Sequence, residues 1–391
     1  MFERHFDIVV AGGGVAGIAA AVAAGRRGMK TVLLEKTVLP GGLATAGLIY
    51  IYLPLCDGNG TQVSFGITEE MLRRSIQYGP GEIPPGWRSA KNAPEAERFR
   101  VVFSPASFIL GLDEMLEEAN VEVWYDTVVT GTVLEGERLA KVAVSNKSGS
   151  GMLSASCFVD ATGDADLAAL SGLPCIEGKN ALACWTLEYR EGKGNLAGDC
   201  ALAMLGFASD PEGIPAGISG RTVSEFVISG RRRYRELLTR EYREGKADRL
   251  RRFPLVFPAM AQLRHTRCVE GRKVLEPGEE WTRFEDSVGL IADWRKSGFV
   301  WEVPYGALLP RGLRGVLAAG RCASARGDAW EVARVIPAAA LTGEVAGVAA
   351  AQSVAAGIAP DELPVGDLQK ELRDRCGFPL HFDELGIGPV R

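Results

Sequence analysis

The sequence predicts an α/β fold in which helices cover a parallel sheet, with a smaller α+β unit inserted into it. Three segments support this prediction. Residues 6–35 contain an apolar strand, a helix of small residues and a second apolar strand. Residues 157–164 form an apolar strand that ends in Ala-Thr-Gly-Asp, and residues 316–347 contain a strand, a loop and an alanine-rich helix. Strands that alternate with helices in this way are typical of parallel sheets.

The composition is that of a globular protein. The 391 residues suffice for about two domains, and 47% of them are hydrophobic while 24% are charged. A net charge of −5 gives no indication of binding to nucleic acid or to an anionic membrane. Three histidines and eight cysteines show neither zinc-ligand spacing nor a CxxC pair, so we expect reduced thiols and no metal site.

The N-terminal residues 6–25 are apolar enough to be mistaken for a signal peptide. Asp7 and the triple glycine at residues 12–14 argue against that interpretation. Further along the chain, no run is long and uncharged enough to span a bilayer. We therefore expect a cytoplasmic protein.

Gly12, Gly14 and Gly17 follow the first expected strand with Gly-x-Gly-x-x-Gly spacing. Gly12 permits a tight turn, Gly14 lets the backbone approach a pyrophosphate, and Gly17 lets the helix lie close to the sheet. The expected helix over residues 15–27 begins at Val15 and Ala16, and its first amides would face the phosphates. The segment predicts dinucleotide binding, against the alternative of a glycine-rich helix packed tightly for structural reasons.

The residues after the second strand favour FAD over NAD. Glu35 ends that strand, where a carboxylate can hold the hydroxyls of an adenosine ribose, and no arginine stands there to accept the 2′-phosphate of NADP. Residues 39–49 (LPGGLATAGLI) then form a glycine-rich loop, which suits a longer cofactor that continues past its pyrophosphate. The expected cofactor contacts in this stretch are Lys36, Gly41, Gly42, Leu43, Ala44 and Thr45.

The middle of the cofactor-binding region is expected to contain a helix, a strand, a three-stranded meander and a final apolar strand. Ser104 is a suitable N-cap for a helix over residues 104–120, with Pro105 at its first position. This order of elements resembles the glutathione-reductase-like FAD fold, and the resemblance implies that the Ala-Thr-Gly-Asp turn at the end of the last strand meets the adenosine and pyrophosphate half of the cofactor. Taken alone, the turn is equally an ordinary strand-to-helix turn. The contacts expected here are Val129, Ala161, Thr162, Gly163 and Asp164.

The C-terminal segment is expected to reach the other end of the same cofactor. Its strand, residues 316–319, ends at Gly320, a loop follows over residues 321–333, and a helix begins near Arg334 with Pro337 in its first turn. The positive end of that helix would face the pyrimidine side of the flavin and stabilise negative charge there. The expected contacts are Gly320, Arg321, Arg334, Val335 and Ala338.

Six pieces of the chain occur in the order found in one bacterial group: GGGVAGIAAAVAAGRRG, PGGLATAGL, FVDATGDADLAALSG, LRHTRCVEG, VPYGALLP and VLAAGRCASARGDAWEVARVIPAAALTGEVAGVAA. In these pieces the sequence resembles the FAD-dependent oxidoreductases, relatives of the succinate/fumarate flavoproteins with a glutathione-reductase-like FAD fold. The resemblance covers nearly the whole chain. It implies FAD as the cofactor and names no substrate. Many relatives carry a His or an acid in the loop after GRC, where this chain has residues 326–330, so no active-site residue carries over there.

The resemblance implies two domains. A Rossmann-like FAD-binding domain, with a parallel sheet and a β-meander, would comprise residues 1–49, 104–175 and 301–391. An inserted α+β substrate or cap domain would comprise residues 50–103 and 176–300. The basic run over residues 230–254 is interpreted as a solvated helix of paired charges rather than a nucleic-acid site.

The expected activity is hydride transfer between a small polar organic substrate and N5 of the flavin. No second Gly-x-Gly-x-x-Gly lies between residues 50 and 315, so O₂, a quinone or a carrier protein is left as the electron acceptor. One alternative is a flavin monooxygenase, although Gly327-Asp328 lies seven residues later than in aromatic hydroxylases. Another is an FAD-binding carrier or regulatory protein without redox turnover.

Five residues are the candidates for catalysis. Arg264 and Arg267 have guanidinium groups that can grip a substrate carboxylate, and His265 between them can exchange a proton near neutral pH. The alternative is a cluster at a surface or a domain interface. Tyr305 and Asp328 are further candidates at the edge of the expected cleft.

Overall fold

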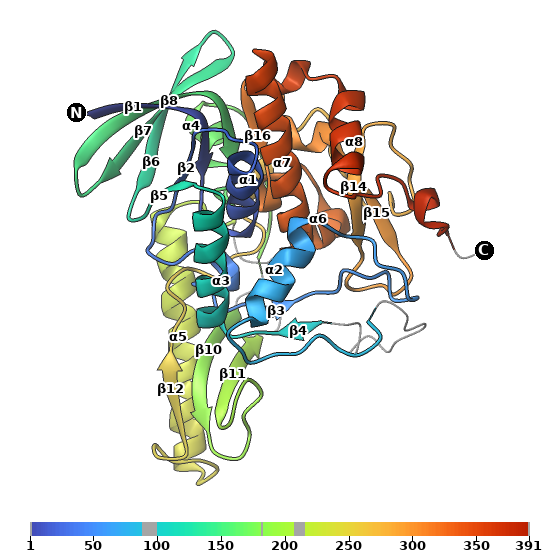
Figure 1. Ribbon diagram of the computed structural model, residues 1–391. Coiled ribbons are helices and arrows are strands. Elements are labelled where there is room, and N and C mark those ends of the chain that lie inside the picture. The colour runs from blue at the N-terminus through green and yellow to red at the C-terminus, as the bar shows by residue number, and fades with distance from the viewer. Residues whose placement is uncertain (1, 88–99, 181–182, 207–215, 390–391) are drawn as a thin grey trace.

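A computed structural model describes residues 2–87, 100–180, 183–206 and 216–389 (Figure 1). Its centre is a seven-stranded sheet of order β5-β2-β1-β8-β7-β6, with β16 paired to β8. The strands are β1 (Phe2–Ala11), β2 (Thr31–Leu34), β5 (Glu122–Trp124), β6 (Val128–Glu135), β7 (Arg138–Asn146), β8 (Gly149–Asp160) and β16 (Val316–Ala318). The predicted α/β class is confirmed.

The long strand β8 joins the parallel and antiparallel parts of this sheet. Its first half pairs antiparallel with β7, placing Ser154 opposite Lys141. Its second half pairs parallel with β16, placing Phe158 opposite Val316, and β1 runs parallel along its other side. The meander and the parallel sheet are therefore one continuous layer, in which the carboxyl ends of β1, β2, β8 and β16 lie at one edge.

Two helices of small residues, α1 (Val15–Gly25) and α7 (Ile336–Ala356), lie side by side on this sheet (Figure 1). A Cβ on Gly343 would lie 2.1 Å from the carbonyl oxygen of Ala16, and one on Gly347 would lie 2.2 Å from that of Ala20. Because both contacts advance in the same direction, the two helices run parallel and their N-termini meet at the same edge of the sheet.

The C-terminal segment differs from expectation in one respect. The loop expected over residues 321–333 contains helix α6 (Gly327–Ala333), and α7 begins at Ile336 rather than near Arg334. Pro337 does lie in the first turn of α7. The short helix is held by its buried face, because Ala329, Trp330 and Val332 pack into the core.

A second sheet lies apart from the first, toward the bottom of Figure 1, and consists of β11-β10-β12 with helix α5 packed against it. The bounds are β10 (Ala183–Arg190), β11 (Cys200–Gly206), α5 (Gly220–Arg243) and β12 (Arg252–Val256). The interpretation of residues 230–254 as a solvated helix of paired charges is only partly correct. The helix ends at Arg243, and Arg252 is buried in an ion pair of 3.0 Å with Glu188, which also accepts a hydrogen bond of 2.7 Å from Tyr234.

The remaining elements connect and cover these two sheets. Helix α3 follows Ser104, whose hydroxyl caps it as expected. The bounds are β3 (Ile51–Tyr52), α2 (Ile67–Ile76), β4 (Val101–Val102), α3 (Pro105–Glu118), α4 (Asp166–Leu170), β9 (Cys175–Glu177), β13 (Arg267–Val269), β14 (Ser287–Ala292), β15 (Val300–Pro304) and α8 (Val365–Asp374), with short 3₁₀ turns at Gly42–Ala44, Tyr305–Leu308, Gly320–Cys322, Pro360–Glu362 and Phe382–Leu385.

Among the residues described, no single helix is long and apolar enough to cross a membrane. Helices α6 and α7 taken together meet the length and composition of a span, but they bend by 79° at their junction. Over the same residues, no group of three or more His, Cys, Asp or Glu side chains is placed to hold a metal ion.

Glu344 makes the stability of this packing dependent on pH. Its carboxylate lies on the buried side of α7 and accepts a hydrogen bond of 2.6 Å from the backbone N–H of Ile67, the first residue of α2. Burial raises the pKa of Glu344 to about 7. The folded state therefore favours the protonated carboxyl, and the stability that Glu344 contributes is lost as the pH rises from about 4.5 to about 7.

We expect Glu344→Gln to remove this dependence. The free energy of unfolding of the variant, relative to the natural chain, should rise by about 3 kcal/mol between pH 4.5 and pH 8, since one pKa unit corresponds to about 1.4 kcal/mol. Denaturant titrations across that range measure it, with Glu117→Gln on the exposed face of α3 as the control. If the free energy of unfolding of Glu344→Gln relative to the natural chain did not change with pH, the expectation would be contradicted.

Candidate active site

A cavity of ≈ 1030 Å³ lies where the carboxyl ends of β1, β2 and β8 meet the N-termini of α1 and α7. This is the crevice in which open α/β sheets bind their ligands. Most of the residues predicted to contact the cofactor line it: Gly12, Gly14, Val15, Ala16, Glu35, Lys36, Gly41, Gly42, Leu43, Ala44, Val129, Ala161, Thr162, Gly163, Gly320, Arg321 and Arg334.

The other predicted contacts lie just behind the lining. Gly17 packs on the turn, because a Cβ there would lie 1.8 Å from the carbonyl oxygen of Gly12. Thr45 is buried and its hydroxyl donates to the carbonyl of Pro40. Asp164 forms an ion pair with Arg321, while Ala338 and Val335 are buried in and before the first turn of α7.

The N-terminus of α1 is open to the cavity. Gly14 is the N-cap of the helix, has an ordinary extended backbone (φ −73°), and provides no side chain to cap the first amides. A Cβ added at Gly14 would meet no atom within 4 Å, whereas one at Gly12 would lie 2.4 Å from the carbonyl oxygen of Ala161. Uncapped amides and an unobstructed approach are what a pyrophosphate needs, so the site fits a dinucleotide.

Glu35 has a fixed orientation at the end of β2. One carboxylate oxygen accepts a hydrogen bond of 2.8 Å from the backbone N–H of Gly13. The other accepts bonds of 2.8 and 2.9 Å from the N–H and the hydroxyl of Thr37. The residue is only 6% exposed and lines the cavity, so its carboxylate is held there in one orientation.

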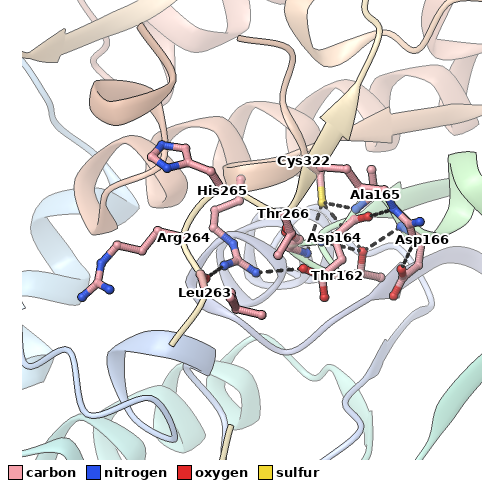
Figure 2. A network of polar contacts seen from close by, with 12 residues as sticks. Thr162, Asp164, Ala165, Asp166, Leu263, Arg264, His265, Thr266 and Cys322 are labelled. Atoms are coloured by element: carbon pink, nitrogen blue, oxygen red, sulfur yellow. Dashed lines mark hydrogen bonds and ion pairs between the residues drawn. The ribbon is translucent and has the colours of Figure 1, made fainter. Parts of the chain in front are cut away.

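A buried network beneath the cavity holds the loop after β8 (Figure 2). Thr162 donates its hydroxyl to the Asp160 carboxylate at 2.7 Å, and the N–H of Leu167 donates to the same carboxylate at 2.8 Å. The sulfur of Cys322 accepts from the N–H groups of Gly163 (3.1 Å) and Ala165 (3.3 Å). Burial raises the pKa of Asp160 to about 6 and that of the Cys322 thiol well above its ordinary value. The sequence analysis did not identify Asp160 or Cys322.

Arg267 belongs to this loop rather than to a substrate pocket. Its guanidinium lies 2.7 Å from the carboxylate of Asp166 and also donates to the carbonyl of Asp164. Arg321 lies on the other side of the loop, 3.2 Å from Asp164, and donates to the carbonyl of Leu263. Arg267 therefore has its charge neutralised, and the structure gives no support to its expected grip on a carboxylate.

A second cavity of ≈ 1550 Å³ continues from the first. The two share Leu43, Ala44, Arg321, Arg334 and Ile336. From that common wall the second cavity extends past Val335 to residues outside the expected cofactor-binding segments, namely Arg100, Trp185, Arg264, Trp294 and Arg295. The arrangement places a mixed aromatic and cationic chamber beside the end of the dinucleotide site nearest α7.

His265 lies behind this chamber rather than in its lining. Its Nε2 accepts a hydrogen bond of 3.2 Å from Nε of Arg334 and lies 3.3 Å from the carboxylate of Glu331, and its ring meets that of Trp330 edge-on. Burial, followed by the charge of Arg334, lowers the pKa of His265 to about 4. The imidazole is therefore neutral near pH 7 and acts as an acceptor that orients Arg334.

The two remaining catalytic candidates line neither cavity. Tyr305 is 2% exposed and donates its hydroxyl to the carbonyl of Pro360 at 2.9 Å. Asp328 is at the exposed start of α6 and pairs with Arg295 at 3.0 Å, which lowers the pKa of the carboxyl. Tyr305 has its own structural partner in the core, whereas Asp328 acts on the second cavity only through Arg295.

Two buried amides, which the sequence analysis did not single out, build the chamber wall. Asn180 accepts hydrogen bonds from the backbone N–H groups of Arg264 (2.7 Å) and His265 (2.9 Å), and donates to the carbonyl of His265 at 2.7 Å. Gln262 accepts from the N–H of Trp185 at 2.8 Å and donates to the carbonyl of Gly47 at 2.7 Å. Gln262 connects β10 of the second sheet to the glycine-rich loop after β2, whereas Asn180 holds the backbone of Arg264 and His265.

We expect Asn180→Ala to lower the free energy of unfolding by about 2–3 kcal/mol, because two backbone N–H groups lose their acceptor. Denaturant titration measures the loss. Asn146→Ala, at the end of β7, removes one donated and one accepted side-chain bond from a partly exposed position and should cost less. Equal costs for the two variants would be evidence against the buried role of Asn180.

Comparisons with known proteins agree with this architecture. The family described as FAD dependent oxidoreductase matches residues 7–188 and 286–372. No curated protein matches the chain significantly in sequence. Among solved structures, a geranylgeranyl bacteriochlorophyll reductase-like protein from Thermoplasma acidophilum has a TM-score of 0.52 and 14% identity, over 96% of this chain and 84% of that one. CabE, an aromatic hydroxylase from angucycline biosynthesis, has a TM-score of 0.51 and 15% identity, over 95% and 66%.

The two solved structures share the fold of this chain. At such low sequence identity they support no statement about its activity or substrate. The family match extends over more than half of the chain and includes both ends of the dinucleotide cavity. The chain therefore belongs to the FAD dependent oxidoreductase family, and its cofactor is FAD.

Proposed function

We propose that this flavoenzyme oxidises or reduces a small polar organic molecule bound in the second cavity. The bound FAD supplies the electron-transfer chemistry, a hydride exchanged at N5 of its flavin. The observation that carries the proposal is the continuity of the two cavities through Arg321, Arg334 and Ile336. A substrate in the second cavity would lie against the α7 end of the first, as direct transfer requires.

The chain's own residues bind and orient the cofactor and the substrate, and they exclude water from the site. Leu43, Ala44 and Ile336 line both cavities with apolar side chains, and Val335 adds to the lining of the second. Arg334 lies beside the N-terminus of α7 and pairs with Glu331, and neutral His265 accepts from its Nε and keeps it in place. The helix dipole of α7 produces a positive potential at this end of the first cavity, which favours an electron-rich cofactor state.

We further propose the division of the chain into two domains. Residues 1–49, 104–175 and 301–391 would bind FAD, and residues 50–103 and 176–300 would form the substrate side. In support, the first cavity draws nearly all its lining from the first set. Arg100, Trp185, Arg264 and Trp294, which extend the second cavity, come from the second set.

A monooxygenase is the second candidate, because the chain shares its fold with an aromatic hydroxylase. The first step of each test, reduction of the flavin, is carried out anaerobically. A purified flavoprotein whose visible absorption is bleached by one of a panel of hydroxy acids, amino acids, amines and sugars supports direct hydride transfer. Bleaching only by a nicotinamide nucleotide, followed by oxygen uptake into an aromatic substrate, supports a monooxygenase. Retained FAD that no donor or acceptor turns over would identify a carrier or regulatory protein instead.

A further inference from the structure

The second cavity has an unusual charge balance. Arg264, Arg295, Arg321 and Arg334 line it together with Arg100, and no acidic side chain belongs to the lining among the residues described. Guanidinium groups brought together in a partly closed cavity repel one another unless anions neutralise them. The partners of each arginine therefore indicate where an anion is missing.

Three of these arginines have carboxylates outside the lining. Arg321 pairs with Asp164 at 3.2 Å. Arg295 pairs with Asp328 at 3.0 Å and with Asp293 at 3.7 Å. Arg334 pairs with Glu331. These three cations are neutralised before any ligand binds.

Arg264 differs from these three, while Arg100, the fifth arginine, is an exposed residue. Its Nη1 donates to the carbonyl of Gln262 at 3.2 Å, and its guanidinium lies 5.0 Å from the ring of Trp185. Within the described part of the chain, no carboxylate lies within ion-pair distance of it. Figure 2 shows its side chain extending away from the network that joins Asp164, Thr162 and Cys322. Burial, reinforced by the neighbouring Arg334, lowers the pKa of Arg264 to about 10, so the group remains charged at pH 7.

The backbone beneath Arg264 is held rigidly. Asn180 accepts from its N–H at 2.7 Å, and the next residue is fixed by the same amide. A half-buried cation kept in place with no described carboxylate within ion-pair distance is costly unless a ligand supplies the missing charge. Arg264 lines the second cavity and not the first, so it is separated from the part of the site that holds the nucleotide.

We infer that the substrate is an organic carboxylate with an apolar body, whose carboxylate is bound by Arg264. The planar guanidinium group can donate two parallel hydrogen bonds to a carboxylate. Because Nη1 of Arg264 already donates to Gln262, the other guanidinium nitrogens are available for this contact. The rest of the chamber suits a flat or branched apolar group, since its lining includes Trp185, Trp294, Leu53 and Ile51. This inference rests on the proposed function and specifies the substrate class of the same site.

Calorimetric titration of the holoenzyme with benzoate and with benzamide tests the inference without any turnover. The two probes have nearly the same shape, and only benzoate is charged. We expect benzoate to bind about tenfold or more tightly than benzamide, and Arg264→Gln to weaken benzoate by about 10- to 100-fold with little effect on benzamide. Arg264→Lys keeps the positive charge but lacks the two parallel donors of the guanidinium. Its affinity for benzoate should therefore lie between those of the natural chain and of Arg264→Gln.

Arg326→Gln is the matched control, because Arg326 is exposed and pairs with Glu276 at 2.9 Å at the surface. It should bind benzoate like the natural chain. The visible absorption of bound flavin reports folding for every variant. Equal binding of benzoate and benzamide, no binding of benzoate, or unchanged benzoate binding in folded Arg264→Gln would each overturn the inference. A failure of the proposed redox activity would appear separately, as benzoate binding with no substrate that bleaches the flavin.

Discussion

We expect Gly14→Asp to produce a folded protein that retains no FAD. Gly14 is the N-cap of α1, has an extended backbone that any residue adopts, and lines the first cavity with open space where a Cβ would stand. Aspartate is a favoured N-cap and complements the positive end of the helix, so the apoprotein should be as stable as the natural one or more so.

The same carboxylate would stand where the α1 amides are open for the cofactor's pyrophosphate. Like charges placed together in a binding site cost several kcal/mol, so the affinity for FAD should fall by about 100-fold or more. Fluorescence titration of the apoprotein with FAD measures the affinity, and denaturant titration of the apoprotein measures its stability.

Gly366→Asp provides a matched control. Gly366 is an exposed residue in the first turn of α8, and a Cβ there would meet no atom within 4 Å. The control adds the same charge near the start of another helix and should leave FAD affinity unchanged. If Gly14→Asp bound FAD as tightly as Gly366→Asp, the pyrophosphate would not lie at the N-terminus of α1.

The sequence predicts those parts of the molecule that depend on residues close together along the chain. The spacing of Gly12, Gly14 and Gly17, followed by Glu35 at a strand end, specifies the turn, the helix and the acidic contact within one short segment. The matching strand and helix after residue 316 have the same local character. For this reason the α/β class and most of the cavity lining were predictable.

The substrate side depends on contacts between distant residues. Asn180 binds the backbone of Arg264, 84 positions away, and Gln262 binds Gly47, 215 positions away. Cys322 meets the Gly163 amide over 159 positions. No periodicity or turn preference reports such pairs, so the sequence singled out the Arg264 segment without showing which of its cations lacks a partner.

The interpretation of Arg267 and Tyr305 illustrates the same limit. Both residue types are common in active sites, and both lie near apolar runs in the sequence. In the fold, Asp166 neutralises Arg267, and Pro360 accepts the hydroxyl of Tyr305 in the core. The residue types made Arg267 and Tyr305 candidates. Whether each one serves a functional site or only supports the fold depends on its partners, which come from other parts of the chain.

Gly17→Ala should unfold or strongly destabilise the protein, whereas Gly14→Ala, three residues earlier in the same motif, should not. A Cβ on Gly17 would lie 1.8 Å from the carbonyl oxygen of Gly12 and 3.2 Å from the Cβ of Ala161. The oxygen belongs to the backbone of the turn, so relief requires α1 to move away from the sheet. That movement would also disturb α7, whose Gly343 lies against the carbonyl of Ala16.

In an exposed helix the same substitution would stabilise by about 1 kcal/mol, because alanine is the better helix former. Here overpacking against backbone should outweigh that gain, and we expect a net loss of about 3 kcal/mol or more in the free energy of unfolding. Denaturant titration of the apoproteins measures both variants. A stable Gly17→Ala apoprotein with an unchanged unfolding midpoint would show that α1 can move from the sheet at little cost. In that case the third glycine of the motif would serve the cofactor rather than the packing of the fold.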